Sequence, residues 1–389
     1  MTDWPYLSAA SGPGEVTNRT LRDHARQVVN HYDPAFVETF ARATDHLKHI
    51  FRTAHDIVIP QGEVVLGMEA VAASLFSPGD RVLNLVSGIF GKWFETFIAR
   101  AGAEPLEVAV PYDQAIDPED VRRALRRHPD VGFLAVVHAE TPSGTVNPVD
   151  DICRIASEAG VITIVDTALG LGSHPFEADA WGVDIAVAGP QKALGGVPGL
   201  CPIAVSPRAW EAMARRRPTP LRESYLSLLD WRESWVEKRA FPYTASVSLV
   251  YALESVAAQV LEVGLERHIA RHTRVGRACR AAVRALGLAP WPARDEIACN
   301  AVTTVRTPEG LDAGALVARM RRPYGVKISG GYKELAGVTF RLGHMGVSAH
   351  PTHLAALLAV LERSLADLGR SVRLGAGVGA AMALLGEWE

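Results

Sequence analysis

The sequence predicts an α/β protein with a large, mostly parallel sheet, followed by a smaller C-terminal α+β part. Short runs made almost wholly of apolar residues, such as 131–137 and 161–165, alternate with segments whose apolar spacing is helical. Strands that are apolar on both faces are typical of parallel sheets covered by helices on both sides. Beyond about residue 255 this alternation changes character, and a chain of 389 residues is long enough for two domains.

The N-terminal half is expected to begin with an arm and then to alternate helices with strands. Residues 1–16 are rich in Gly, Ser and Pro, which favours an extended arm. The elements predicted next are helix within 20–51 with a break at 32–34, strand 57–59, helix 69–76, strand 81–85, helix 88–101, strand 107–110, helix 117–128, strand 131–137, helix 150–159 and strand 161–165. The helix at 117–128 begins with Asp-Pro-Glu-Asp, in which Asp suits the N-cap and Pro the first helical position.

The C-terminal half is expected to contain one long helix and a second, smaller sheet. The predicted elements are strands 185–188 and 202–205, helix 244–287, strand 301–305, helix 312–322, strand 338–342, helix 350–367 and a helical tail over 374–389. We therefore divide the chain into an N-terminal arm (1–16), a large α/β domain (17–255) and a small α+β domain (256–389).

Composition excludes several classes of protein. The 40 Lys and Arg residues nearly balance the 43 Asp and Glu residues, so the formal charge of −3 gives no electrostatic footprint for nucleic acid. The four cysteines are scattered without a CxxC pair, which argues against a disulfide framework and a zinc site. The N-terminus lacks the pattern of a signal peptide, and no apolar stretch is long enough for a membrane span. We expect a soluble cytoplasmic protein without a metal.

An aspartate ends one predicted strand, and a lysine follows the next. Asp166 closes the apolar run ITIVD, and Lys192 lies in the Gly/Pro-rich loop of VAGPQKALGGVPGL (187–200). Parallel strands joined by a helix bring their carboxyl ends to one sheet edge, where α/β proteins bind ligands. A carboxylate there can hold a cationic ring nitrogen, and a poorly hydrated lysine favours the neutral amine that a Schiff base needs. A capping aspartate and a solvated loop lysine are the alternatives.

A third polar segment, HAETPSGT (138–145), follows the apolar run 131–137 and falls at the same expected edge. Thr141 and Ser143 offer hydroxyl groups, and Gly144 permits close approach of the backbone, although a plain Pro-Ser-Gly turn is the alternative. The chain has only six lysines. Lys192 is the one that combines a strand-end loop, apolar neighbours and a carboxylate partner.

Together these features resemble the class V aminotransferases, which are fold-type I enzymes dependent on pyridoxal phosphate. The resemblance covers almost the whole chain and is greatest toward the pyridoxamine–pyruvate aminotransferases, with alanine–glyoxylate and serine–pyruvate aminotransferases more distant. It rests on the pattern (G/S)-x-x-K-A-L-x-x-x-P-G-L around Lys192 and on the T-P-S-G-T turn. The other segments that carry it are GEVVLGMEA (62–70), VLNLVSGIFGK (82–92), VPYDQAIDPE (110–119), ETPSGTVNP (140–148), LLDW (228–231), FPYTASVS (241–248) and RLGHMG (341–346).

The resemblance implies a fold-type I enzyme whose large domain binds the B6 cofactor. Lys192 matches the lysine that holds the cofactor aldehyde as an aldimine and later moves the proton. Asp166 matches the carboxylate that pairs with the pyridine nitrogen, and Thr141 the residue that bonds the ring 3-oxygen. Phe90 lies where the family stacks an aromatic side chain on the ring, although the most similar group has Tyr there.

The resemblance also implies a substrate site shared between two subunits. Arg341 matches the arginine that grips the substrate α-carboxylate, a role that suits its planar fork and is favoured by its apolar neighbours Phe340 and Leu342. Tyr243 occupies an aromatic position that the neighbouring subunit supplies in the family. A homodimer is therefore implied, and it could assemble further into a tetramer.

One departure from the family concerns the cofactor phosphate. Most class V enzymes have a small hydroxylated loop where this chain has Gly62-Glu63-Val64-Val65. A carboxylate repels phosphate, and valines remove hydroxyl donors. The pyridoxamine–pyruvate enzymes share this glutamate and use unphosphorylated pyridoxamine. Glu63 therefore favours unphosphorylated pyridoxal or pyridoxamine as substrate, unless it is a structural cap and other donors hold a phosphate.

A second departure concerns specificity. Near Tyr332 the most similar group has an arginine that helps to hold the substrate, and Tyr332 cannot replace its charge. The leading hypothesis is amino-group transfer between an amine or amino acid and a small 2-oxo acid such as pyruvate or glyoxylate. The alternative is a biosynthetic enzyme that uses the same quinonoid for β- or γ-elimination or for carbon–carbon bond formation. A non-enzymatic binding role is disfavoured by Lys192 and Asp166.

Overall fold

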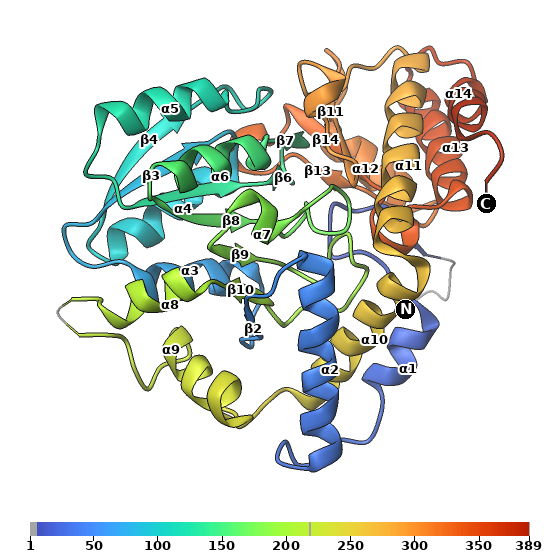
Figure 1. Ribbon diagram of the computed structural model, residues 1–389. Coiled ribbons are helices and arrows are strands. Elements are labelled where there is room, and N and C mark those ends of the chain that lie inside the picture. Colours follow the sequence, from blue (N-terminus) through green and yellow to red (C-terminus); the bar gives the residue numbers. More distant parts are fainter. Residues whose placement is uncertain (1–5, 218, 389) are drawn as a thin grey trace.

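A seven-stranded sheet forms the centre of the larger part of the molecule (Figure 1). The computed structural model describes residues 6–217 and 219–388, so the first five residues of the predicted arm and the last residue of the predicted tail lie outside the described residues. The strands in spatial order are β2 (Asp56–Val58), β10 (Ile203–Val205), β9 (Ile185–Val187), β8 (Ile162–Asp166), β5 (Phe133–Val137), β3 (Arg81–Val86) and β4 (Glu104–Ala109).

Six of the seven strands point the same way. Strand β10 alone runs antiparallel to both of its neighbours, β9 and β2. The central strands β3, β5, β8, β9 and β10 are almost wholly buried, which explains their unbroken apolar sequences. The predicted α/β class is thus confirmed, with one reversed strand that an apolar run of three residues could not reveal.

Helices cover both faces of this sheet. In Figure 1, α5 and α6 lie above it, and α3 and α8 lie below it. Asp117 caps α5 by accepting a hydrogen bond from the Glu119 amide, with Pro118 in the first turn, as predicted. The helices up to residue 236 are α1 (Asn18–His24), α2 (Pro34–Phe51), α3 (Val64–Leu75), α4 (Ile89–Arg100), α5 (Pro118–Arg127), α6 (Val149–Glu158), α7 (Ala178–Trp181), α8 (Pro207–Ala214) and α9 (Leu228–Trp231), which continues as a π-helical turn (Arg232–Val236).

The single long helix predicted over 244–287 is wrong. The chain forms α10 (Val247–Val263) and α11 (Leu265–Ala285), and their axes differ by 86°. The break lies at Gly264, whose φ of 91° is open to glycine and strained for other residues. Apolar spacing continues across the break because both helices are amphipathic, so periodicity alone does not reveal it.

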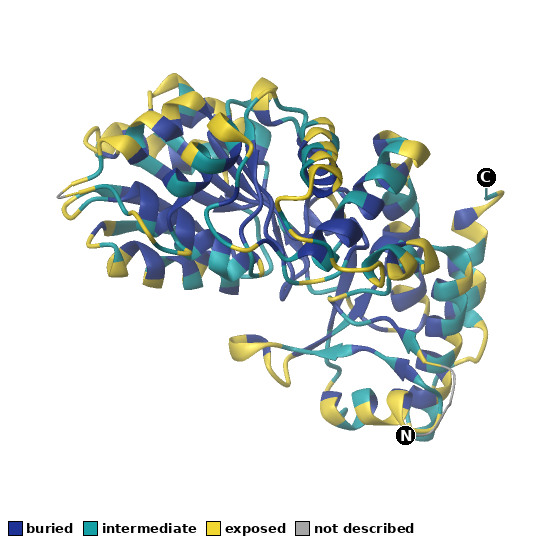
Figure 2. Cartoon of the chain, turned by 90° about the horizontal axis from the view of Figure 1, so that it is seen from below, coloured by how far each residue is buried: buried dark blue, intermediate teal, exposed yellow. Residues whose placement is uncertain are grey.

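The C-terminal part is a second α+β unit. Its sheet has the order β11 (Val302–Arg306), β14 (Thr339–Gly343), β13 (Ser329–Gly330), and its helices are α12 (Ala313–Arg321), α13 (Pro351–Asp367) and α14 (Ala376–Leu385). One hydrophobic cluster fills the large part, and a second one joins α11, α13 and α14 to the small sheet. Figure 2 shows the buried residues inside the molecule and the exposed ones on the outer helices and loops. The domain boundaries near residues 16 and 255 remain a prediction.

The N-terminal arm packs against this C-terminal unit. Strand β1 (Leu7–Ser8) pairs in parallel with β12 (Val326–Lys327), and the carbonyl oxygen of Ala9 accepts a hydrogen bond from the Gly343 amide. A short hairpin, β6 (Ala139–Glu140) and β7 (Thr145–Val146), follows β5. The arm and this hairpin lie next to the ligand-binding edge described below.

Neither a membrane segment nor a metal cluster stands out in the described ranges. No single helix there has the length and apolar composition to cross a bilayer, and only the bent pair α10 and α11 passes that test when taken together. Among residues 6–217 and 219–388, no group of three or more His, Cys, Asp or Glu side chains is placed to hold a metal ion.

Candidate active site

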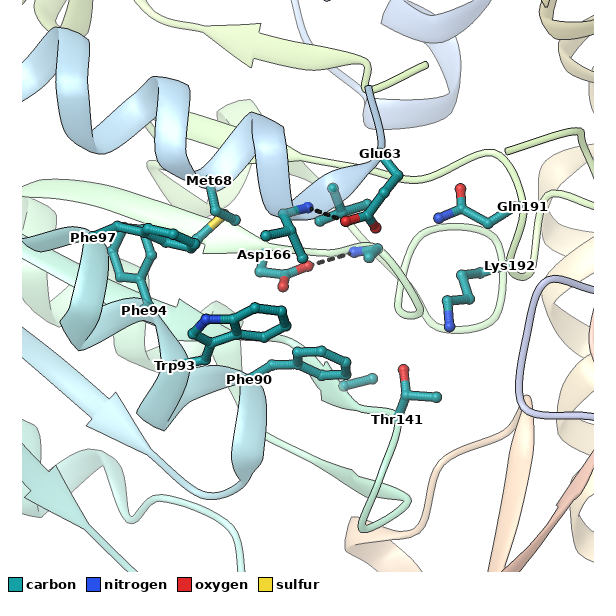
Figure 3. Close-up of a pocket in the computed structure, with 14 residues that line it drawn as sticks. Glu63, Met68, Phe90, Trp93, Phe94, Phe97, Thr141, Asp166, Gln191 and Lys192 are labelled. Atoms are coloured by element: carbon teal, nitrogen blue, oxygen red, sulfur yellow. Dashed lines mark hydrogen bonds between the residues drawn. The ribbon is translucent and has the colours of Figure 1, made fainter. Parts of the chain in front are cut away.

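Asp166 and Lys192 meet at the carboxyl-terminal edge of the large sheet. Asp166 is the last residue of β8 and pairs in register with Val187, the last residue of β9. Lys192 lies in the loop that follows β9, and both side chains line one pocket (Figure 3). The apolar strands and the parallel crossover therefore place these two residues together, as the sequence predicts.

The Asp166 carboxylate is poorly solvated. Its side chain is 7% exposed, and burial raises its pKa to about 6 even though the Ala168 amide donates a 2.9 Å hydrogen bond to Oδ1. Lys192 counters part of this rise. A buried carboxylate with free lone pairs stabilises a cationic ring nitrogen placed beside it, since the low dielectric strengthens the attraction.

The surroundings of Lys192 shift its side chain toward the neutral amine. Burial, and after it the Arg341 guanidinium, lower its pKa to about 8, while Asp166 and Glu63 oppose the change. Its Nζ donates a 3.0 Å hydrogen bond to the backbone oxygen of Ser11 in the N-terminal arm. A neutral amine at physiological pH is the form that attacks a carbonyl group.

The pocket holds about 590 Å³ when its open mouth is included. Two helices form much of its wall, with Val64, Val65 and Met68 from α3 and aromatic residues from α4 (Figure 3). The lining residues are Glu63, Val64, Val65, Met68, Phe90, Trp93, Phe94, Phe97, Ala139, Thr141, Asp166, Ala168, Gln191 and Lys192. All six cofactor-binding residues predicted from the sequence are in this set.

The pocket has a flat aromatic wall opposite polar groups. Phe90 and Trp93, one turn apart on α4, lie nearly parallel at 20° with ring centroids 6.2 Å apart. Thr141, in the turn between β6 and β7, is 4% exposed and faces the same space. This arrangement suits a planar heteroaromatic ring between an aromatic face and hydrogen-bonding side chains.

Glu63 serves as the N-cap of α3. Its side chain accepts a 3.1 Å hydrogen bond from the Val65 amide, and it is exposed at the rim of the pocket. Its negative charge raises the pKa of both Asp166 and Lys192. Capping and proximity to the pocket, offered as alternatives by the sequence, are therefore both present.

Arg341 is a largely buried cation without a carboxylate partner in the described part of the chain. It lies on β14, between the buried residues Phe340 and Leu342, and its Nε donates a 2.9 Å hydrogen bond to the Gly330 oxygen. Burial lowers its pKa to about 10. An arginine in this condition favours binding of an external carboxylate, which would restore its missing counter-charge.

Tyr332 and Tyr243 lie apart from the lining of this pocket. Tyr332 stacks at 27° on Phe90 with ring centroids 6.4 Å apart, and the Lys333 ammonium lies 4.6 Å from the Trp93 ring centroid. Tyr243 accepts a 2.8 Å hydrogen bond from Trp231 and packs on Tyr225. Neither tyrosine lines the pocket, but Tyr332 stacks on its wall residue Phe90, and Tyr243 lies by the Gln61 backbone at the approach to α3.

Two features of the site were not predicted from the sequence. Glu140 is fully buried and accepts hydrogen bonds from the Phe90 and Gly91 amides at 3.1 and 2.8 Å, which anchors the first turn of α4. Gly12 of the arm passes so close that an added Cβ would lie 2.7 Å from Lys192 Nζ. Glu140 was visible inside the polar turn at 138–145, but no pattern in sequence links residue 12 to residue 192.

The residues present fit the ring of the expected cofactor, pyridoxal phosphate, better than its phosphate. Asp166, Lys192, Thr141 and Phe90 provide the charge, amine, hydroxyl and aromatic face that a pyridine aldehyde requires. At the α3 end, the lining consists of Glu63, Val64 and Val65, and Glu63 already occupies the Val65 amide. That end offers a negative charge and two hydrocarbon side chains to any phosphate.

Comparison with known proteins agrees with this geometry. Residues 18–335 match the family described as Aminotransferase class-V. The chain is 41% identical to pyridoxamine–pyruvate transaminase of Mesorhizobium japonicum over 98% of this chain and 97% of that one. It is 30% identical to L-aspartate–glyoxylate aminotransferase of Paracoccus denitrificans over 95% and 93% of the two chains.

Solved structures show the same fold. The crystal structure of pyridoxamine–pyruvate aminotransferase from Mesorhizobium loti matches with a TM-score of 0.94 at 40% identity, covering 98% of this chain and 97% of that one. Ureidoglycine–glyoxylate aminotransferase from Bacillus subtilis matches with a TM-score of 0.94 at 29% identity, covering 99% of both chains. The chain therefore belongs to the aminotransferase class-V family, as an amino-group-transferring enzyme with the fold-type I architecture and pyridoxal phosphate as the cofactor that the family implies.

Proposed function

We propose that this enzyme moves an amino group between unphosphorylated pyridoxamine and a small 2-oxo acid such as pyruvate. The observation that carries the proposal is the Glu63 carboxylate at the start of α3, beside two valines, where a phosphate would otherwise bind. Repulsion between two negative groups disfavours the phosphate ester, whereas a neutral hydroxymethyl group can donate a hydrogen bond to the glutamate. The similarity to pyridoxamine–pyruvate transaminase supports the same substrate pair.

We assign the chemistry to residues at the sheet edge. A bound B6 aldehyde supplies an electron sink for the transfer. Lys192, whose pKa burial lowers to about 8, would bind the aldehyde carbon covalently through Nζ and would move the proton during the transfer. Asp166 would hold the ring nitrogen in its protonated form, Phe90 would support the ring face and Thr141 would hydrogen-bond the ring 3-oxygen.

The acceptor is recognised by its carboxylate. Arg341, with no acidic partner in the described residues, would bind the α-carboxylate of the 2-oxo acid. Tyr332 and Phe90 narrow the adjacent space with two stacked rings, which favours a short acceptor. Glyoxylate is the competing acceptor, because several similar enzymes are named for it.

We infer that the working enzyme is a cytoplasmic homodimer with a shared active site. Tyr243 lies outside the lining of the pocket of its own chain, near the Gln61 backbone, and its neighbour Thr244 accepts a 2.8 Å hydrogen bond from the Gln61 side chain at the approach to α3. A second subunit can therefore present Tyr243 to this pocket, as the family resemblance implies. Further assembly into a tetramer would leave this shared site unchanged.

Absorption spectroscopy and product analysis test the substrate assignment. Purified enzyme titrated with pyridoxal should show a bound Schiff-base band, and with pyridoxamine plus pyruvate it should release pyridoxal and alanine. We expect pyridoxal phosphate to bind at least tenfold more weakly than pyridoxal. Glu63→Gln should reduce this difference in affinity, because it removes the negative charge. Tighter binding of the phosphate ester by the natural enzyme would overturn the proposed substrate.

Two control variants separate the site from the substrate choice. Lys192→Ala should abolish the Schiff-base band, whereas Lys92→Ala should keep it, because Lys92 is exposed and paired with Glu95 and Glu107. A band that survives in Lys192→Ala would contradict the assigned lysine. Alanine formation without dependence on pyridoxamine would instead keep the lysine and reject pyridoxamine as the donor.

A further inference from the structure

A second cavity lies behind the Lys192 loop and shares no lining residue with the active-site pocket. It holds about 830 Å³ with its open mouth included. Its walls come from the loop after Lys192 (Leu194 and Gly195), from α10, from the start of α11 and from the segment 346–353. The cavity is thus formed between the large sheet domain and the C-terminal unit. We call it the basic cavity, after Arg271, His268, His350 and His353 in its lining.

Arg271 is a largely buried cation that the described residues leave without an ion pair. Its Nη2 donates hydrogen bonds to the Gly346 oxygen at 3.1 Å and to His268 Nδ1 at 3.3 Å. Its Nε is buried without any hydrogen-bond acceptor. A buried guanidinium in this state resembles Arg341 in the active site, since each lacks the anion that would balance its charge.

Two histidines add hydrogen-bonding ring nitrogens to the wall. His350 Nδ1 accepts a 3.3 Å hydrogen bond from the Thr352 amide, which leaves Nε2 as its donor. Burial, His353 and Arg271 together lower the pKa of His350, so the three basic groups lie close enough to interact. The Glu15 carboxylate lies beside this wall, with its Oε2 3.5 Å from His353 Nε2, and it would repel a second negative charge on a ligand.

The rest of the cavity is apolar. Leu194, Val256, Val260 and Val347 supply hydrocarbon surface opposite the basic wall, and Val263 stands at its margin with 46% of its surface exposed. A ligand that satisfies both walls needs one negative group and a hydrocarbon body. A dianion such as phosphate would satisfy Arg271 but would leave the hydrocarbon wall unmatched and meet Glu15.

We propose that the basic cavity binds an apolar monocarboxylate, with its carboxylate on Arg271 and His350 and its hydrocarbon body against Leu194 and Val260. Such a ligand would also stabilise the Lys192 loop. His268 donates a 2.9 Å hydrogen bond to the oxygen of Ala193, the residue after Lys192, and Arg271 holds Gly346, against which Gly195 packs. The proposal does not depend on the identity of the active-site substrates.

Calorimetric titration of the cofactor-loaded enzyme with benzoate tests the proposal, with benzamide as the neutral analogue of the same shape. We expect saturable benzoate binding, binding of benzamide at least tenfold weaker, and a higher thermal unfolding midpoint in benzoate. Arg271→Gln should weaken benzoate binding at least tenfold. Arg267→Gln, an exposed arginine on the same helix, is the matched control and should bind as the natural enzyme does.

Two further variants test where the benzoate binds. Arg341→Gln should retain benzoate binding, and its loss would place the benzoate in the active site and overturn the proposal. Val263→Trp should block the mouth of the cavity without touching Arg271, which tests the site even if Arg271→Gln fails to fold. Equal benzoate binding by Arg271→Gln and the natural enzyme would reject the site, and tighter binding of inorganic phosphate than of benzoate would reject the ligand class.

Discussion

At the scale of single residues, the proposed chemistry rests on ionisable groups that are buried away from water. Lys192, Asp166 and Glu140 lie within one buried edge of the sheet, and burial is the largest influence on the pKa of each. Burial lowers the pKa of the lysine and raises the pKa of both acids, so all three move toward neutrality. Lys192 and Asp166 can be identified from sequence by residue type and strand ends, but the direction and size of their pKa changes depend on the enclosing structure.

Replacing Glu140 with Gln should loosen the aromatic wall of the pocket. The carboxylate accepts two backbone hydrogen bonds at the start of α4, and a glutamine amide can accept only one while its NH₂ opposes the other. We expect a loss of about 1–3 kcal/mol in the free energy of unfolding and weaker pyridoxal binding, because Phe90 would shift. Urea denaturation and pyridoxal titration measure both effects.

Glu107→Gln is the matched control for that prediction. Glu107 is partly exposed and pairs with Lys92 on the surface, so its loss should change the free energy of unfolding by less than about 1 kcal/mol. Pyridoxal affinity should not change. If both variants lose the same stability, Glu140 has no special part in anchoring α4.

The N-terminal arm offers a second test at this scale. Gly12 has a φ of 102°, and a Cβ there would lie 2.7 Å from Lys192 Nζ, so Gly12→Ala should displace the amine and lower kcat at least tenfold. Gly14→Ala is the control, because its Cβ would meet Met345 at an ordinary 3.5 Å. Steady-state rates of the two variants should differ clearly. Similar rates would show that the arm does not constrain Lys192.

At the scale of elements, strand ends and helix starts position the chemistry. Asp166 lies at the end of strand β8, Lys192 in the loop after β9 and Phe90 in the first turn of α4. Sequence located these elements to within a few residues because their apolar periods are regular. It missed the break between α10 and α11, where amphipathic spacing runs on and only a glycine marks the corner.

Gly264→Ala should therefore destabilise the fold through backbone strain. No atom lies within 4 Å of the added Cβ, so the expected loss of about 1–3 kcal/mol comes from the φ of 91° alone. Gly379→Ala is the matched control. Gly379 lies inside α14 with open space around it, where alanine should stabilise by up to about 1 kcal/mol. Chemical denaturation of both variants should give changes of opposite sign.

At the scale of the whole molecule, buried histidines should make the protein labile to acid. Burial is the main cause that lowers the pKa of five histidines, to about 3 or 4 in four of them and well below the usual value in His272. In the unfolded chain they titrate near 6.5. The five are His138, His174, His268, His272 and His344.

The sign of the effect follows from linkage. Between about pH 6.5 and 4 the unfolded chain binds more protons at these histidines, so the free energy of unfolding should fall as the pH falls through that range. Glu140 and Asp166, whose pKa values are raised to about 7 and 6, oppose this trend because the folded state protonates them first. Glu95, whose pKa burial also raises, opposes the trend as well, but three acids against five histidines still leave a net loss of stability.

Urea midpoints at pH 7.5, 6 and 5 measure this loss, and they should decrease in that order. His344→Gln should flatten the dependence, since it removes one titrating site while an amide can still hydrogen-bond Thr303. Each unit of difference between the folded and unfolded pKa of a histidine corresponds to about 1.4 kcal/mol in the free energy of unfolding. Urea midpoints that rise as the pH falls would show that the acids with raised pKa values outweigh the histidines.

The sequence by itself determined the fold class, the family and the residues at the strand ends, because apolar periodicity and short motifs are local properties that neighbouring residues carry together. Only the tertiary structure decided which distant segments complete the site: Gly12 against Lys192, Glu140 under Phe90, and Arg271 behind the lysine loop. These contacts join residues far apart in the chain, and their consequences, desolvation and an unbalanced buried charge, exist only once packing has excluded water.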